Sequence, residues 1–296
     1  MTTVKESIPV NKIQSQSSAD APSKITRVTT SDGRYYKVLG EKLPSVSSVL
    51  QVIPKPALVE WRIKKALFGM YQHLSSHSGE PITPELLNDA SNEGQIESIK
   101  EAQDAAAIGS AVHELISIDL LDNEVDEDEI DEDLKCGYQS YLLWKKEKGS
   151  ELNLVDSETA VYMSSDATRD CIGYAGTIDA LFKKADGKFL LVDFKTSKRI
   201  YVDHLVQLWS YVKTIESAVA SSMDMTHWND WMKTIEQNGI AAQVIRLNKR
   251  GRPGYEVSDL LSHDNNLHTS HNLSNESVPL IWKSALELYT SSKGFL

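Results

Sequence analysis

The stretch Gly173–Ser197 reads GYAGTIDALFKKADGKFLLVDFKTS and contains two apolar runs on either side of a tight-turn signal. The pair Asp186-Gly187 is typical of a β-hairpin turn, so the two runs are predicted to be neighbouring antiparallel strands. If Gly187 takes the left-handed position of a three-residue loop, the register places Asp179 opposite Asp193. Directly opposed residues share a face, with Cβ atoms about 4.5–5.5 Å apart.

Three charged side chains are therefore expected on one face of this apolar hairpin. Lys195 is two residues beyond Asp193, and alternate residues of a strand project to the same side. A buried carboxylate without a partner costs several kcal/mol, whereas a divalent cation would compensate Asp179 and Asp193 together. Two hard oxygen ligands suit Mg²⁺ or Mn²⁺. The alternative is a buried ion pair between Asp193 and Lys195, with Asp179 exposed at a strand end.

These residues resemble the PD-(D/E)xK nuclease superfamily and, within it, the RecB-type exonucleases. The resemblance covers about residues 35–220. A proline-containing segment at 42–58 is similar to the opening of phage exonucleases, a group that is also similar to the mitochondrial genome maintenance exonuclease. Its motifs follow the order of the family: a Gly-x-x-x-His helix at Gly109–His113, Gly176–Asp179, Asp193–Thr196 and a Gln-x-x-x-Tyr helix at Gln207–Tyr211. Glu158 falls where related proteins carry a glutamate on the preceding strand.

The resemblance implies a role for each matched residue. Asp179, Asp193, His113 and the backbone carbonyl of Phe194 would hold the metal ion. Lys195 would position the attacking water or stabilise the transition state. The remaining matched or neighbouring residues would contact DNA or support the site: Glu158, Lys198, Arg199, Gln207 and Tyr211.

Spacing alone leaves other interpretations of the helical residues open. A lone histidine on a helix, such as His113, is often a hydrogen-bonded core residue. Gln207 and Tyr211 are one turn apart, and the apolar stripe of their helix predicts that both lie on its polar flank. Exposed helix or loop surface would explain Lys198 and Arg199 equally well.

The expected activity is that of a metal-dependent DNA exonuclease acting on single-stranded ends. A structure-specific endonuclease that cuts flaps or branched DNA is the nearest alternative. A DNA-binding module without catalytic activity is an alternative of another class, although the retention of Asp179, Asp193 and Lys195 together argues against it. The chain is expected to be a monomer or a small homo-oligomer.

Charge and composition set further limits. The chain has 296 residues and a net charge of −11, but the segment 122–133 holds nine carboxylates, which leaves about −2 for the rest. That segment is predicted to be an acidic loop, and the remainder can still present a basic groove to DNA. No apolar run is long enough for a membrane span, and two cysteines make no disulfide framework. A cytoplasmic location is expected, which would be a host's cytoplasm if the protein is viral; a mitochondrial location is the alternative.

The predicted fold is α/β, with a restriction-endonuclease-like core in which helices flank a central mixed β-sheet. Residues 1–23 are expected to form a disordered leader, and 24–296 a single nuclease domain. The predicted strands lie near 25–29, 35–38, 152–163, 173–183, 188–195 and 241–247. The predicted helices lie near 57–74, from 83 to 120 with breaks, and near 134–148, 203–220 and 278–289. The segment 248–252 is expected to be a basic turn near DNA or a solvated hairpin tip.

Overall fold

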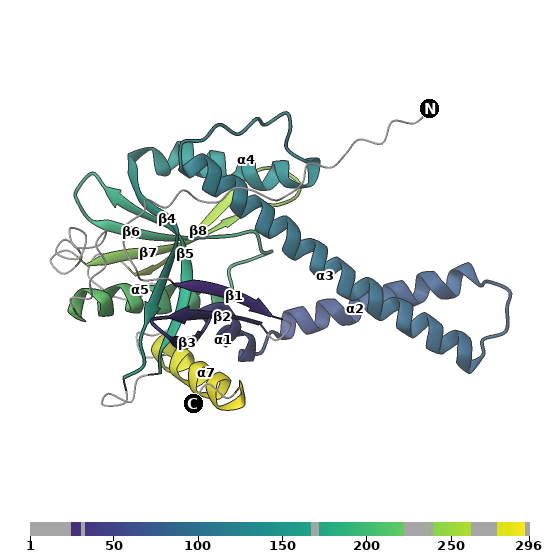
Figure 1. The fold of residues 1–296 in the computed structure, drawn as a ribbon. Helices are drawn as coiled ribbons and strands as arrows, with labels where there is room; N and C mark the ends of the chain where they lie inside the picture. Colours follow the sequence, from purple (N-terminus) through teal and green to yellow (C-terminus); the bar gives the residue numbers. More distant parts are fainter. Residues whose placement is uncertain are drawn as a thin grey trace.

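A five-stranded mixed sheet and a smaller three-stranded sheet, flanked by helices, make up this α/β protein (Figure 1). The computed structural model describes residues 25–30, 33–166, 172–221, 235, 239–261 and 277–293. The predicted leader at 1–23, and Ser31 and Asp32 of the first predicted turn, lie outside these residues.

The five-stranded sheet has the order β4-β5-β6-β7-β8. The first three strands form an antiparallel meander, β7 runs parallel to β6, and β8 is antiparallel to β7. Helix α5 lies in the connection from β6 to β7, as a parallel crossover requires. The bounds are β4 Leu152–Met163, β5 Tyr174–Lys184, β6 Phe189–Lys195, α5 Val202–Ser221, β7 Ile240–Leu247 and β8 Tyr255–Leu261.

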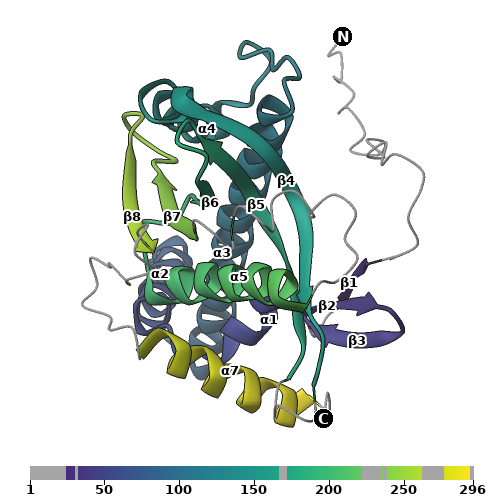
Figure 2. The same ribbon diagram turned by 90° about the vertical axis from the view of Figure 1, so that its left-hand side faces the viewer.

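Each face of this sheet is covered by its own helices. The residues of β6 alternate between two apolar clusters: Phe189 and Leu191 pack on the side of α5 and α7 (Ser277–Lys293), and Leu190 and Val192 pack on the side of α4 (Glu132–Glu147). Figure 2 shows α5 and α7 next to each other on one side of the sheet. Because both faces are covered, any charge on β6 is taken out of water.

The smaller sheet lies against β4 and β5. Its strands are β1 Thr26–Thr30, β2 Gly33–Val38 and β3 Glu41–Pro44, and the short helices α1 Val46–Val49 and η1 Leu50–Val52 follow. Tyr36, Val38 and Leu43 pack against Tyr162 and Ala175 of the large sheet. This packing places the small sheet against the end of β4 and the start of β5.

A pair of long antiparallel helices projects from the body of the protein (Figure 1). They are α2, Pro56–Ser76, and α3, Pro84–Leu120. Glycines allow the two backbones to approach closely, since a Cβ at position 94 would lie 2.2 Å from the carbonyl oxygen of Ala66. The inner half of α3 returns to the sheet, where Val112 and Ile116 join the core under α4.

Most predicted elements are confirmed, with four differences. Helix α3 is continuous over 37 residues, without the expected breaks. The predicted acidic loop at 122–133 overlaps the first turn of α4, which begins at Glu132 because acidic residues favour the start of a helix. Strand β3 and helix α1 were not predicted. The segment 248–252 lies in the connection of the β7–β8 hairpin, whose second strand was also not predicted.

Within the described residues, no helix is long and apolar enough to cross a membrane.

Candidate metal centre

The β5–β6 hairpin has the register that the turn signal predicts. Lys184 N–H donates to the Lys188 carbonyl at 2.8 Å, and Gly187 has a φ of +83°. The ladder runs from Lys183 opposite Phe189 to Ala180 opposite Val192. The predicted pairing of Asp179 with Asp193 would be the next step, but the ladder ends at Ala180 and Val192, and the Asp179 side chain accepts the Phe194 N–H instead. The local turn chemistry therefore sets which residues of the two strands face each other.

Asp193 is the most deeply buried charged group of the site. Its side chain is 1% exposed, and its Oδ1 atom has no hydrogen-bond partner among the described residues. Its one compensating contact among them is an ion pair, with Lys195 Nζ 2.6 Å from Asp193 Oδ2. This pair was the structural alternative considered for these residues. One ammonium group leaves Asp193 Oδ1 without a partner, so the ion pair does not satisfy the carboxylate.

Asp179 is held from two directions. Its Oδ2 accepts the backbone N–H of Phe194 at 2.8 Å, and Nδ1 of His113 lies 3.4 Å from the same oxygen. The Asp179 side chain is largely buried, so the alternative in which it is exposed at a strand end is wrong. His113 reaches it from α3, which passes close to the end of β6: a Cβ at Gly109 would lie 3.0 Å from Thr196 Oγ1.

Glu158 completes a compact group of possible metal ligands. One ligand atom each of His113, Glu158 and Asp179 lie within 4.8 Å of one another. Glu158 lies opposite Asp179 in the register of β4 and β5, but the two are not paired, and Glu158 has a φ of +50°. A left-handed backbone at a residue other than glycine costs about 1–2 kcal/mol and is often found at functional sites. Glu158 was predicted as a DNA-binding or supporting residue, and no sequence signal indicated this conformation.

The protonation equilibria of these ligands depend on burial and on their shared charge. Burial and the nearby Lys195 cation lower the pKa of His113 to about 4, so the imidazole is neutral and able to bind a metal near pH 7. Burial, and then the Asp179 carboxylate, raise the pKa of Glu158 to about 7. Burial also raises the pKa of Asp179, against the opposing effects of Lys195 and the Phe194 N–H.

Burial and neighbouring charges also shift the pKa values of Asp193 and Lys195, the ion pair on β6. Burial raises the pKa of Asp193 to about 6 even though Lys195 opposes the shift. For Lys195, burial alone would lower the pKa, but Asp193 and Asp179 outweigh it and raise the value. The Lys195 ammonium therefore stays charged, whereas the raised pKa values of Glu158, Asp179 and Asp193 disfavour the ionisation of these carboxyl groups. A bound cation would reverse this effect, because it stabilises the ionised carboxylates.

The Gln207–Tyr211 pair does not lie on a polar flank, so this part of the prediction is wrong. Tyr211 is buried in the core under α5, and its hydroxyl accepts a hydrogen bond from Gln207 Nε2 at 3.1 Å. Its ring occupies the space beside Gly176, where a Cβ would lie 2.3 Å from Tyr211 Cε1. The apolar stripe of α5 is wider than expected, because the absence of a side chain at Gly176 makes room for the tyrosine ring.

Lys198 and Arg199 lie exposed just beyond β6, where their side chains are available to a ligand. The Arg199 guanidinium lies 5.8 Å from the centre of the Tyr201 ring. The structure shows where both residues are, and their predicted contact with DNA stays a prediction.

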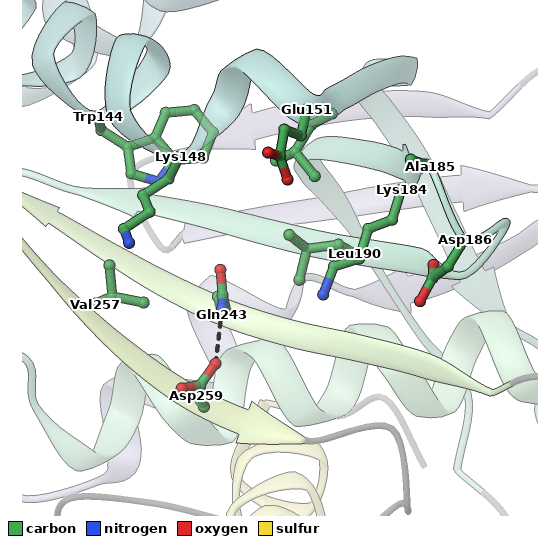
Figure 3. A pocket seen from close by; sticks show the side chains of 11 residues that line it. Trp144, Lys148, Glu151, Lys184, Ala185, Asp186, Leu190, Gln243, Val257 and Asp259 are labelled. Atoms are coloured by element: carbon green, nitrogen blue, oxygen red, sulfur yellow. Dashed lines mark hydrogen bonds between the residues drawn. The ribbon is translucent and has the colours of Figure 1, made fainter.

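A separate hollow lies at the other end of the hairpin (Figure 3). Lys148 follows α4, Lys184 and Asp186 lie at the β5–β6 turn, and Gln243 donates to Asp259 at 2.7 Å across β7 and β8. None of the candidate metal ligands lines this hollow. Its carboxylates at Glu151, Asp186 and Asp259 are all exposed, so it lacks a buried acid such as Asp193 of the metal centre.

Comparison with known proteins returned no assignment: no protein-family model and no curated protein sequence matches this chain.

Proposed function

We propose that this protein is a metal-dependent deoxyribonuclease with a restriction-endonuclease-like core, and that it is an exonuclease acting on single-stranded DNA ends. The observation that carries the proposal is the Asp193 carboxylate, which is 1% exposed and not satisfied by Lys195 alone. A buried acid in this state, next to a group of His113, Glu158 and Asp179, is what a divalent cation site requires.

The donor set fits Mg²⁺ or Mn²⁺. Carboxylate oxygens suit both ions, and a neutral imidazole is acceptable to Mn²⁺ more readily than to Mg²⁺. His113, Glu158 and Asp179 would hold the ion, with Asp193 and the Phe194 carbonyl as the further ligands that the family resemblance implies. When bound, the ion would supply charge for polarising a phosphoryl oxygen and for lowering the pKa of a water molecule.

The chain's own residues would do the remaining work. Lys195, held 2.6 Å from Asp193, would direct its ammonium protons at the attacking water or at a phosphate oxygen that gains charge. Phe194 N–H fixes Asp179 from the backbone, and this limits the freedom of the carboxylate before a ligand arrives. Gln207 and Tyr211 would support the site from helix α5, through the contact of the Tyr211 ring with Gly176 on β5.

The test is digestion of single- and double-stranded DNA labelled at the 5′ or the 3′ end, with Mg²⁺, Mn²⁺ or EDTA. We expect metal-dependent release of mononucleotides or short oligomers from linear single strands and no cutting of closed circles. Cutting of circles or at flap junctions would favour the endonuclease. Metal-independent DNA binding without any cleavage would favour the non-catalytic module.

Matched variants connect the activity to the site. Asp179→Asn and Lys195→Met should each lower kcat at least 100-fold, the usual scale for the loss of a metal ligand or of a group that stabilises transition-state charge. Glu151→Gln removes an exposed carboxylate in the separate hollow and should leave the rate unchanged. Wild-type rates in both site variants would reject the catalytic assignment.

The partner that this function implies is DNA, and a cytoplasmic location is proposed with it. Whether the protein acts as a monomer or as a small homo-oligomer would follow from its mass in solution, measured by light scattering.

A further inference from the structure

Arg27 lies on the inner face of the small N-terminal sheet. It is directly opposite Tyr36 in the antiparallel pairing of β1 and β2, and opposed residues project to the same side. Tyr36 is on the side that packs against the large sheet, and Ile25, two residues before Arg27, packs against the same cluster. The pairing therefore places Arg27 on the face of the small sheet that is turned towards β4 and β5, where it stays exposed at the edge of the sheet.

The large sheet presents the metal centre to this row of residues. The Tyr36 hydroxyl lies 2.8 Å from Thr177 Oγ1, and Thr177 is two residues before Asp179 on β5. Ala160, opposite Thr177 on β4, packs on the same cluster as Tyr36. Glu158 is two residues before Ala160 on β4 and lies opposite Asp179 in the register of β4 and β5, so the metal centre is next to the residues that Tyr36 contacts.

The positive charge of Arg27 interacts with the metal centre, because it opposes the rise in the pKa of Glu158. The guanidinium nevertheless forms no ion pair or hydrogen bond with the described residues, and Arg27 is exposed. A cation that acts on Glu158 without closing onto its carboxylate is available to bind an anion. A guanidinium offers its donors in a planar fork that matches two oxygens of a phosphate group.

The edge of the small sheet, as far as the structure describes the chain, provides the approach. Strand β1 is the outer strand in the order β1-β2-β3, and four of its five residues are exposed. A strand of nucleic acid running along this edge would therefore pass Arg27 immediately before it reaches the carboxylates.

We propose that Arg27 forms a phosphate-binding subsite beside the metal centre and takes an internal phosphodiester of the nucleic-acid strand adjacent to the bond that is cut. The subsite rests on the proposed nuclease function and adds a substrate-binding residue from the N-terminal sheet. Tyr36 acts as a positioning residue, because its hydrogen bond to Thr177 fixes the small sheet relative to Asp179.

The experiment compares Arg27→Met and Arg27→Lys in the full chain, with Lys37→Met as the matched control. Lys37 is an exposed cation on the opposite face of the same sheet. Binding of a fluorescein-labelled single-stranded oligonucleotide in Ca²⁺ gives Kd over a range of salt concentrations. Cleavage in Mn²⁺ gives KM and kcat, and thermal unfolding with and without Mn²⁺ measures metal binding separately.

We expect Arg27→Met to raise Kd and KM roughly 10- to 100-fold, as for the loss of a charged hydrogen-bonded pair. The slope of log K against log salt should become shallower by about 0.7, the value for one phosphate contact on a single strand. Arg27→Lys should keep part of the affinity, because it keeps the charge without the fork. The Mn²⁺-induced rise in Tm should be unchanged in both variants, and Lys37→Met should bind within twofold of wild type.

Two results would overturn the subsite. One is an unchanged Kd and salt slope in Arg27→Met. The other is a loss of the Mn²⁺ effect on Tm without a change in Kd, which would assign Arg27 to neutralising Glu158. In both cases the wild-type protein still cleaves DNA, so the proposed function survives. A wild-type protein that neither binds nor cleaves the oligonucleotide would reject the function together with the subsite.

Discussion

Replacing Asp193 with asparagine should stabilise the metal-free protein at neutral pH and abolish its response to metal. Asparagine has nearly the shape of a protonated aspartic acid but cannot ionise. Asp193 is 1% exposed, and burial raises the pKa of its carboxyl to about 6 from an ordinary value of 3.8. The folded protein therefore holds a proton on Asp193 over a range in which the unfolded chain has already lost it.

The sign and the size of the change in stability follow from this difference in pKa between the folded and the unfolded chain. A group with a raised folded pKa stabilises the fold fully below its unfolded value, and that stability is lost as pH rises from about 4 to 6. With ~1.4 kcal/mol for each pH unit, the ionised Asp193 disfavours the folded state by about 3 kcal/mol above pH 6. The attraction of Lys195 is already included, because it is one of the causes that set this pKa. At ~2.1 cal/mol/K per residue, the gain for a chain of this length is roughly 5 °C in Tm.

Differential scanning calorimetry at pH 4 and pH 8, in EDTA and in Mn²⁺, measures each quantity. In EDTA we expect Asp193→Asn to melt roughly 5 °C above wild type at pH 8, with little difference at pH 4. Mn²⁺ should raise the Tm of wild type and not that of the variant. A lower Tm for Asp193→Asn at pH 8 in EDTA would refute the reasoning, because it would mean that the ion pair with Lys195 stabilises the fold.

Three further predictions concern packing and protonation. Gly176→Ala should lower the Tm by several degrees, because the new Cβ would lie 2.3 Å from Tyr211 Cε1. In thermal unfolding, the double variant with Tyr211→Leu should recover part of this loss. No recovery would contradict the contact. Gly94→Ala should also destabilise the folded protein, because the new Cβ would lie 2.2 Å from the Ala66 carbonyl oxygen. Replacing a helical glycine with alanine usually stabilises a protein by about 1 kcal/mol, so a raised Tm would contradict this prediction. Mn²⁺ affinity measured by calorimetric titration should increase as pH rises to about 7, where protons leave Glu158, and a pH-independent affinity would exclude this residue as a ligand.

Local sequence determined the central hairpin and its register. The Asp186-Gly187 turn and the alternation of apolar residues act over only a few positions, so they specify which side chains share a face before any other part of the chain is placed. The ladder between β5 and β6 confirms this register, and the Asp193–Lys195 contact follows from it. Helix starts were equally local: Thr83 accepts the N–H of Leu86 and begins α3 where its capping pattern predicts.

Only the tertiary structure decided what surrounds that hairpin. His113 lies near Asp179 because α3 crosses the end of β6, and neither residue carries a sign of the other in its local pattern. The left-handed backbone of Glu158 and the burial of Tyr211 against Gly176 depend on contacts between separate elements. Strand pairing and turn chemistry are short-range and leave a periodic signal, whereas a group of side chains assembled from α3, β4 and β5 arises from packing that no single segment encodes.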